Sequence, residues 1–523
     1  MPIHNPRREW LQNAMASVLA QSYENWQLCL CHDAASEAWV SDYICLLARN
    51  DKRIRHVALS PWLGICSALN RAGSLASGDY VGFLDQNDAL EDSAVHAVVE
   101  TLQSGPADII YSDEDHFDGD GVRARPNFKP GWSPELLLSC MYLGRFLVVS
   151  RAGMEQAGWF RSACDGAEDY DLVLRMTDAN AKVKHVPEIL YHARQHPAAV
   201  TSSVPAARQS LTDAALRRGW KGHASEGGLP GASSLTREVE RYPSVSVIIC
   251  SRNSKLLQTC LESLQRYTDY PDWETVVVMH TFGCDRNLAR VVSTSKCVSV
   301  AYSGPFNFSR MNNLGAATAK GDLLIFLNDD VEAMQPDWMT YMTAQLVRPD
   351  VGVVGACLLY PSGMLQHAGV VVPMSDGAGH VGRGSPLNSS ELWPWLAFTR
   401  NVTAVTGACL GIRKEVFDRV DGMDTAFPNN YNDVDLCLRV GREGLMTIYE
   451  SRALLRHKEC ATRTAGTTFD ERELFHARWG HLLGSPDPYY NPSLRTDTEA
   501  VLLRFPVPTP AGSTAGKCAE PAS

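Results

Sequence analysis

The sequence predicts an α/β protein made of two tandem copies of one domain, each with a mainly parallel central sheet. Three observations carry this prediction: an internal repeat, short β-rich runs that alternate with helical patterns, and polar residues where strands end. The length of 523 residues favours two or three domains at about 100–200 residues each. With 45% hydrophobic and 20% charged residues, the composition rules out a disordered, collagen-like or coiled-coil chain.

The repeat has three landmarks that occur in the same order in both halves. They are a gapless match that ends in polar residues, an acidic pair followed by Leu-x-Leu-Arg, and a histidine after a short apolar stretch. The gapless match joins 70–87 in the first copy to 313–330 in the second. The acidic pair lies in 168–175 and 432–439, and the histidines are His192 and His457. Chance is a poor explanation for three ordered matches, so we interpret the chain as a duplication.

Composition also predicts the domain limits. We expect an N-terminal domain at 1–204, a linker at 205–243 that contains a Gly/Pro/Ser cluster, a C-terminal domain at 244–506 and a disordered tail at 507–523. The first copy opens with little of the apolar strand that begins the second. We therefore expect either a mis-assigned start codon or an N-terminal domain with an incomplete sheet edge.

Within the second copy the elements follow in order. They are a strand at 245–250, a helix at 256–266, a strand at 274–278 and a strand at 322–327 that ends in acids. Strands that alternate with helices form mainly parallel sheets, and ligands bind beyond the carboxyl ends of such strands. The polar stretches 85–88 and 328–330 fall at that edge.

Charge and cysteine content narrow the class of protein. The chain has 48 Lys and Arg against 59 Asp and Glu, a net charge of −11, which argues against a general nucleic-acid binder. Its 15 cysteines include no Cys-x-x-Cys pair, as expected for reduced thiols in the cytoplasm. No apolar run reaches the roughly 18–20 residues of a membrane span, and the N-terminus lacks the apolar core of a signal peptide. We expect a cytoplasmic protein, with peripheral contact at a membrane surface allowed.

The acids after the strand at 322–327 have two interpretations. Carboxylates at a strand end suit Mg²⁺ or Mn²⁺, which fill their other positions with water and phosphate oxygens. Alternatively, Asp329 and Asp330 cap the next helix. Repetition of this strand and its polar end in both copies favours the site.

Asp433 and Asp169 each precede a run that starts like a helix. The simple interpretation is a carboxylate stabilised by the helix dipole, and the functional one is a general base that deprotonates an attacking hydroxyl. Similarly, His457 and His192 are either core histidines or metal ligands.

A Gly-rich segment between His367 and His380 has no metal-ligand spacing, and we interpret it as a loop over the site. Trp393, Trp395 and Phe398 follow it. Their rings could stack on the apolar face of a sugar.

Longer motifs then carry a family resemblance. In the second copy they are 305–313, 327–330, 363–369, 405–409, 432–439 and 487–492; in the first copy, 16–23, 111–115, 128–134 and 190–194. In these stretches the chain resembles bacterial family 2 glycosyltransferases with two tandem GT-A domains, nucleotide-diphospho-sugar transferases with a Rossmann-like fold. It is similar to proteins of O-antigen and rhamnan polysaccharide assembly. This resemblance extends from Met1 to about Pro506.

The resemblance implies a role for each matching residue. The implied catalytic bases are Asp433 and Asp169; the metal ligands are Asp330 and His457, with Asp88 and His192 in the first copy. The implied nucleotide-sugar contacts are Ser251, Asn253, Asn313, Asn328 and Asp329, with Asp85 and Asn70 in the first copy. Asp435, His367 and Trp393 would lie in the acceptor site or its loop. Two departures from the family stand out: Asn87 occupies a usual acid position, and Met279-His280 and His32 stand where an Asp usually contacts the base.

The resemblance therefore implies an inverting glycosyltransferase that depends on Mg²⁺ or Mn²⁺. It would transfer a sugar from a nucleotide-diphosphate donor to a growing cell-surface polysaccharide, with a glycan or lipid-linked glycan as acceptor. It would bind no nucleic acid, and could associate peripherally with inner-membrane polysaccharide machinery. Two alternatives stay open: a sugar nucleotidyltransferase, and a non-catalytic protein that binds carbohydrate or acts as a scaffold.

Overall fold

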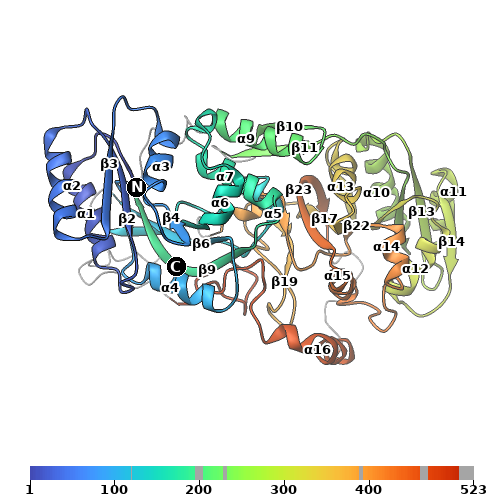
Figure 1. Cartoon of the computed structure of the whole chain (residues 1–523). Helices are drawn as coiled ribbons and strands as arrows, with labels where there is room; N and C mark the ends of the chain where they lie inside the picture. The colour runs from blue at the N-terminus through green and yellow to red at the C-terminus, as the bar shows by residue number, and fades with distance from the viewer. Residues whose placement is uncertain (119–120, 195–203, 228–231, 388–392, 460–468, 506–523) are drawn as a thin grey trace, which may run out of the picture.

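The computed structural model describes residues 1–118, 121–194, 204–227, 232–387, 393–459 and 469–505. It contains two α/β units that lie side by side, the N-terminal one in blue and cyan and the C-terminal one in yellow to orange (Figure 1). The α/β class expected from the sequence is confirmed.

The C-terminal unit is built on one sheet with the strand order β14-β13-β12-β15-β22-β17-β23-β16. Its strands are β12 (Val245–Ser251), β13 (Trp273–His280), β14 (Val298–Tyr302), β15 (Leu323–Asn328), β16 (Val331–Ala333), β17 (Val351–Leu359), β22 (Cys409–Arg413) and β23 (Met446–His457). The first four neighbours run parallel, whereas β22 and β16 run antiparallel to the strands beside them. Strands β12 and β15 lie next to each other, so their carboxyl ends meet at one edge.

Helices pack around this sheet. They are α10 (Ser254–Tyr267), α11 (Leu288–Thr294), α12 (Phe308–Thr318), α13 (Trp338–Leu346), α14 (Lys414–Arg419), α15 (Asn432–Arg442) and α16 (Phe469–Leu483). The last of them, α16, contacts α15. Helix α10 shows why the sequence folds this way: Leu257, Cys260, Leu261 and Leu264 recur at helical spacing and are buried. Each predicted element of this unit is present, with ends shifted by a few residues.

The N-terminal unit repeats the same strand order in two pieces, β3-β2-β1 and β4-β8-β6-β9-β5. Its strands are β1 (Pro2–Ile3), β2 (Leu28–Asp33), β3 (Ile54–Leu59), β4 (Tyr80–Gly82), β5 (Ala89–Leu90), β6 (Ile109–Phe117), β7 (Arg123–Asn127), β8 (Leu147–Ser150) and β9 (Val183–Arg194). Its helices include α1 (Arg8–Leu19), α2 (Ala38–Asn50), α3 (Ile65–Gly73), α4 (Ala94–Gln103), α5 (Pro134–Leu137), α6 (Arg151–Ala157) and α7 (Glu168–Asp178).

The short first strand interrupts the sheet at a different place from the one we expected. Strand β1 corresponds to β12, which lies between two neighbours, whereas β1 pairs only with β2 among the strands that the structure describes. The gap is therefore inside the strand order and not at a sheet edge. A strand of two residues offers too few backbone groups to join β2 to β4.

The segment expected as a linker is folded. It forms α9 (Val204–Arg217) and the hairpin β10 (Gly222–Glu226) and β11 (Ser233–Arg237), drawn in green in Figure 1. Leu211, Ala214 and Ala215 of α9 are buried, so this helix belongs to the hydrophobic core. The expected disordered tail lies outside the described residues.

Buried polar contacts join the two units. Glu135 of the N-terminal unit forms ion pairs with Arg348 and, at 3.3 Å, with Arg237. Near the C-terminus, the Asn491 side chain donates a 2.8 Å hydrogen bond to Asp113. Although burial alone would raise it, the charges of the two arginines lower the pKa of Glu135 to about 2.

We expect Glu135→Gln to destabilise the protein by about 3–5 kcal/mol at pH 7, because it removes the buried carboxylate from two buried arginines and leaves Arg348 with the exposed carboxylate of Asp350. The folded pKa of Glu135 lies below its ordinary value of 4.5. Its contribution is thus present above pH 4.5 and is lost as pH falls toward 2. Urea unfolding at pH 7 and pH 3.5 should show the variant approaching wild type at the lower pH. The exposed Glu155→Gln is the control, and an equal loss at both pH values would contradict this account.

Candidate active site

The acids after β15 lie against the end of β12. The Ser251 hydroxyl donates a 2.6 Å hydrogen bond to Oδ2 of Asp329. Asp329 and Asp330 are each only 8% exposed. Burial, together with the neighbouring charge of Asp330, raises the pKa of Asp329 to about 6. Two adjacent, largely buried carboxylates concentrate negative charge at this strand end.

The histidine landmark meets the acidic landmark through strand pairing. In the β16–β23 ladder, Val331 is paired with His457. This register brings Nε2 of His457 to 3.2 Å from Oδ1 of Asp330. Residues separated by more than a hundred positions thus form one side of the site.

The third landmark, Asp433, lies in the first turn of α15 and is half-buried. Its Oδ2 accepts a 2.7 Å hydrogen bond from the Gly407 N–H, and its Oδ1 accepts one of 2.9 Å from Val434. The next residue, Ala408, accepts a 3.0 Å hydrogen bond from the backbone N–H of Asn328. Because Gly407 and Ala408 are consecutive, they place Asp433 beside the acidic end of β15.

Asp330 and His457 place one carboxylate and one imidazole next to each other. Within the described ranges, the structure contains no group of three or more His, Cys, Asp or Glu residues arranged to hold a metal. Mn²⁺ and Mg²⁺ accept few protein ligands when phosphate oxygens and water complete their coordination. This pair of residues, next to the charge-rich Asp329, therefore fits such an ion.

Several residues assigned to donor binding from the sequence have other contacts. Asn313 donates to the Met423 carbonyl at 2.7 Å and accepts from its N–H at 2.9 Å. Asn70 forms the matching pair of contacts with Phe160, at 2.9 and 3.1 Å. The side-chain oxygen of Asn253 caps α10. These contacts give the three amides structural roles, and their expected contacts with the donor stay predictions.

Asp435 is also structural. It is fully buried and pairs with Arg439 and Arg478, each at 2.7 Å, and with the Trp479 indole at 3.0 Å. Its counterpart in the first copy, Asp171, is fully buried and pairs with two arginines in the same way. The expected role of Asp435 in the acceptor site is therefore replaced by an internal ion pair.

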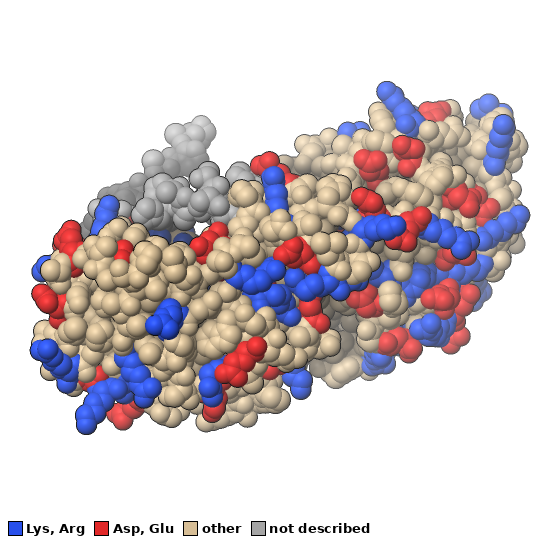
Figure 2. Space-filling view, turned by 45° about the horizontal axis from the view of Figure 1, so that its top comes forward, with Lys and Arg blue, Asp and Glu red and all other residues tan. Residues whose placement is uncertain are grey.

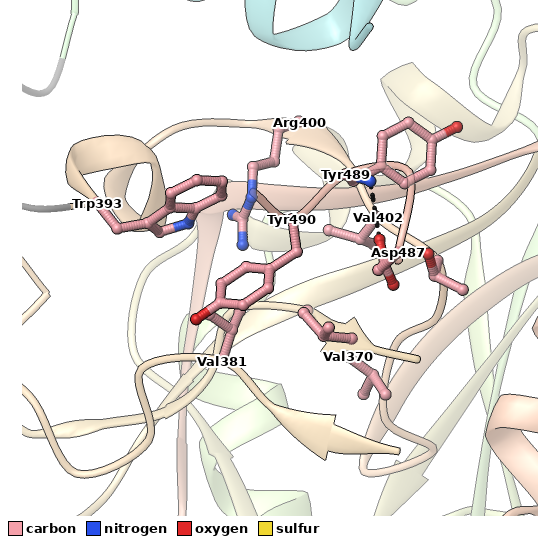
Figure 3. A pocket seen from close by; sticks show the side chains of 11 residues that line it. Val370, Val381, Trp393, Arg400, Val402, Asp487, Tyr489 and Tyr490 are labelled. Carbon is pink, nitrogen blue, oxygen red and sulfur yellow. Dashed lines mark hydrogen bonds between the residues drawn. The ribbon is translucent and has the colours of Figure 1, made fainter. Parts of the chain in front are cut away.

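The loop residues lie inside the protein. His367 is buried with its Nδ1 at 3.0 Å from Nδ1 of His380, and burial lowers the pKa of His367 well below its usual range. Trp393 is 1% exposed. In Figure 3 it borders a small pocket together with Arg400 and Tyr490. Trp393 is thus not an exposed platform for a sugar, and Trp395 is likewise buried, with its indole N–H bonded to Phe128.

The first copy places its landmarks in the same register. In the β5–β9 ladder Ala89 pairs with His192, just as Val331 pairs with His457. Asp88 therefore occupies the position of Asp330. The turn before Asp88 is one residue longer than the turn before Asp330, and Asn87 lies in this longer turn. The gapless sequence alignment was wrong here by one position. Asp85 accepts a 2.8 Å hydrogen bond from the Asn87 N–H within this turn.

Asp169 shares with Asp433 the hydrogen bond from the next residue along the chain. Its Oδ1 accepts a 2.7 Å hydrogen bond from Tyr170, the next residue, and burial raises its pKa. Two residues near these sites were missed in the sequence: Gly407, which holds Asp433, and Arg145. Gly407 lies in the quoted motif 405–409, whereas Arg145 carries no motif signal.

The surface carries both signs of charge. Figure 2 shows Lys and Arg side chains among Asp and Glu side chains on the face it presents. In the parts of the chain that the structure describes, no helix has the length and apolar character of a membrane span.

Two family models match the chain, one to each copy. "Glycosyl transferase family 2" matches residues 1–157, and "Glycosyltransferase like family 2" matches residues 243–481. The fold and the site thus define a glycosyltransferase with two domains in tandem. The chain belongs to glycosyltransferase family 2.

Two relatives identified by their sequences support this assignment. The O-antigen biosynthesis protein RfbC of Myxococcus xanthus is 35% identical over 520 residues, which cover 97% of this chain and 41% of that protein. The uncharacterized protein y4gI of Sinorhizobium fredii is 32% identical over 537 residues, covering 97% of this chain and 58% of that protein. The chain thus spans about half the length of these relatives. Among solved structures, GalNAc-T7 with UDP, GalNAc and Mn²⁺ matches 42% of this chain and 44% of that chain, at 14% identity and a TM-score of 0.35.

Proposed function

We propose that the C-terminal copy is an inverting, metal-dependent transferase site that uses a nucleotide-diphosphate sugar. The observation that carries this proposal is the convergence of Asp330, His457 and Asp433 at one strand end. Inversion needs one general base and no covalent intermediate, and Asp433 supplies a carboxylate of the required kind.

In this mechanism Asp433 accepts the proton of the acceptor hydroxyl. The N–H groups of Gly407 and Val434 fix both carboxylate oxygens while leaving lone pairs available for that proton. Asp330 and His457 would hold Mg²⁺ or Mn²⁺. When bound, such an ion stabilises the negative charge of the departing diphosphate. Ser251 orients Asp329, whose carboxylate adds to the negative field around the cation.

The acceptor belongs to the same proposal. Similarity to an O-antigen biosynthesis protein supports a cell-surface polysaccharide, as a glycan or a lipid-linked glycan. A lipid-linked acceptor would bring the protein to the cytoplasmic face of the inner membrane as a peripheral partner.

We expect Mn²⁺ or Mg²⁺ to increase the rise in melting temperature that a nucleotide-diphosphate sugar causes. A ligand at a hundredfold excess over its Kd stabilises the native state by about 2.7 kcal/mol. Asp330→Ala should abolish this metal-dependent increase, because it removes the carboxylate that would hold the ion. Thermal unfolding of the full chain with UDP-, GDP- and dTDP-sugars, with and without metal, measures it.

The control is Asp322→Ala, at an exposed acid near the other end of β15. This variant should retain the metal-dependent shift. A metal-dependent shift that survives in Asp330→Ala would refute the site, and the absence of any shift with every donor would favour the non-catalytic alternative.

A further inference from the structure

The N-terminal copy carries an arginine where the C-terminal copy has a methyl group. Strands β4 and β8 pair in the same register as β15 and β22. Following these ladders back to the turn before β8 and β22 places Arg145 at the position of Ala408. Ala408 lies between the Asp433 anchor and the end of β15, so its counterpart lies in the centre of the N-terminal site.

Arg145 pairs with the carboxylate that matches Asp330. Its Nη1 lies 3.0 Å from Oδ2 of Asp88, which also accepts a 2.8 Å hydrogen bond from the Tyr191 hydroxyl. The other oxygen of Asp88 accepts a 2.7 Å bond from the Arg194 N–H. Asp88 is fully buried in this arrangement, so a protein cation and two neutral donors already surround it.

The histidine of the N-terminal site is engaged as well. Nδ1 of His192 lies 2.6 Å from Asp115, and Nε2 lies 3.2 Å from Glu91. In the C-terminal copy, by contrast, Nε2 of His457 faces Asp330. His192 therefore presents no ring nitrogen to Asp88, and the two residues do not form a contact like that between His457 and Asp330.

We propose that the N-terminal copy takes no divalent metal and that Arg145 is the cation that faces the diphosphate of a nucleotide bound there. Its side chain is 42% exposed, so a ligand can reach it while Nη1 contacts Asp88. A guanidinium has five N–H donors, and within the described residues the Arg145 guanidinium donates to Asp88 alone. The remaining donors match phosphate oxygens, which a guanidinium binds in a two-pronged manner.

This inference rests on the proposed function in one respect, since it takes both copies as sites for a nucleotide diphosphate. The first test counts Mn²⁺ ions bound per full-length chain, by equilibrium dialysis with electron paramagnetic resonance, in saturating UDP or GDP. We expect one ion in wild type, none in Asp330→Ala and one in Asp88→Asn. Two ions in wild type, or loss of an ion in Asp88→Asn, would overturn the inference. No ion in wild type would instead overturn the proposed function.

The second test measures binding of UDP and GDP in EDTA by calorimetry, in the Asp330→Ala background. We expect metal-free binding that Arg145→Ala weakens about tenfold or more, because a charge-assisted hydrogen bond is lost. Arg145→Lys should restore part of the affinity. Arg151→Ala, which removes an arginine paired with Glu155, is the control and should leave it unchanged. Binding that is absent without metal, or unaffected in Arg145→Ala, would overturn the inference; melting curves confirm that each variant folds.

Discussion

Asp433→Asn should lower the rate of sugar transfer by about 10²–10⁴-fold, the contribution that a positioned general base makes to such a step. The amide cannot accept the proton of the acceptor hydroxyl, although it fills the same space in the first turn of α15. Donor binding should survive, because the metal-dependent contacts come from Asp330 and His457. Initial rates with a donor and a polysaccharide acceptor, alongside calorimetric donor binding, provide the measurement.

The matched control for this variant is Asp169→Asn, at the equivalent position of the N-terminal copy. If the C-terminal copy performs the transfer, Asp169→Asn retains most of the rate. Full activity in Asp433→Asn would exclude Asp433 as the base. A parallel loss of donor binding would show that the residue positions the donor and does not transfer the proton.

Asp435→Asn, only two residues along the same helix, should reduce the stability of the fold and not the chemical step. Removing its charge leaves Arg439 and Arg478 without their buried carboxylate, and we expect a loss of about 3–5 kcal/mol in the free energy of unfolding. Arg478 lies on α16, so the attachment of that helix to α15 should weaken first. Urea unfolding followed by tryptophan fluorescence measures the loss, with Trp479 reporting on this contact.

Asp433→Asn is the natural comparison, because its carboxylate has no arginine partner in the described structure and accepts only from backbone N–H groups. Its stability should change by about 1 kcal/mol, the usual value of one neutral hydrogen bond. Equal losses of stability in the two variants would contradict the division between a catalytic and a structural acid.

The duplicated landmarks predicted which residues meet, because each of them lies at the end of an element. Asp330 follows the end of β15, His457 ends β23, and Asp433 lies at the start of α15. The sheets of α/β proteins gather such positions at one edge. The roles of Asn313 and Asp435 could not be predicted in this way. In the sequence, an Asn or Asp beside a motif looks the same whether it binds a ligand or holds a loop. Only its partners in the structure distinguish these roles: Met423 for Asn313, and Arg478 for Asp435.

The sequence by itself determined that the protein is α/β, that it is duplicated, and that acids end corresponding strands of both copies. It determined these features because they depend on local periodicity and on chain order, which are written along the chain. The resemblance already implied Asp88 as the first-copy counterpart of Asp330, whereas the gapless alignment put Asn87 there; the tertiary structure decided the register, since strand pairing absorbs one extra residue in the turn. It also decided that Arg145 enters the N-terminal site, because β8 lies beside β4 in space although more than sixty residues separate them. Such contacts arise from packing between distant segments, which no local pattern encodes.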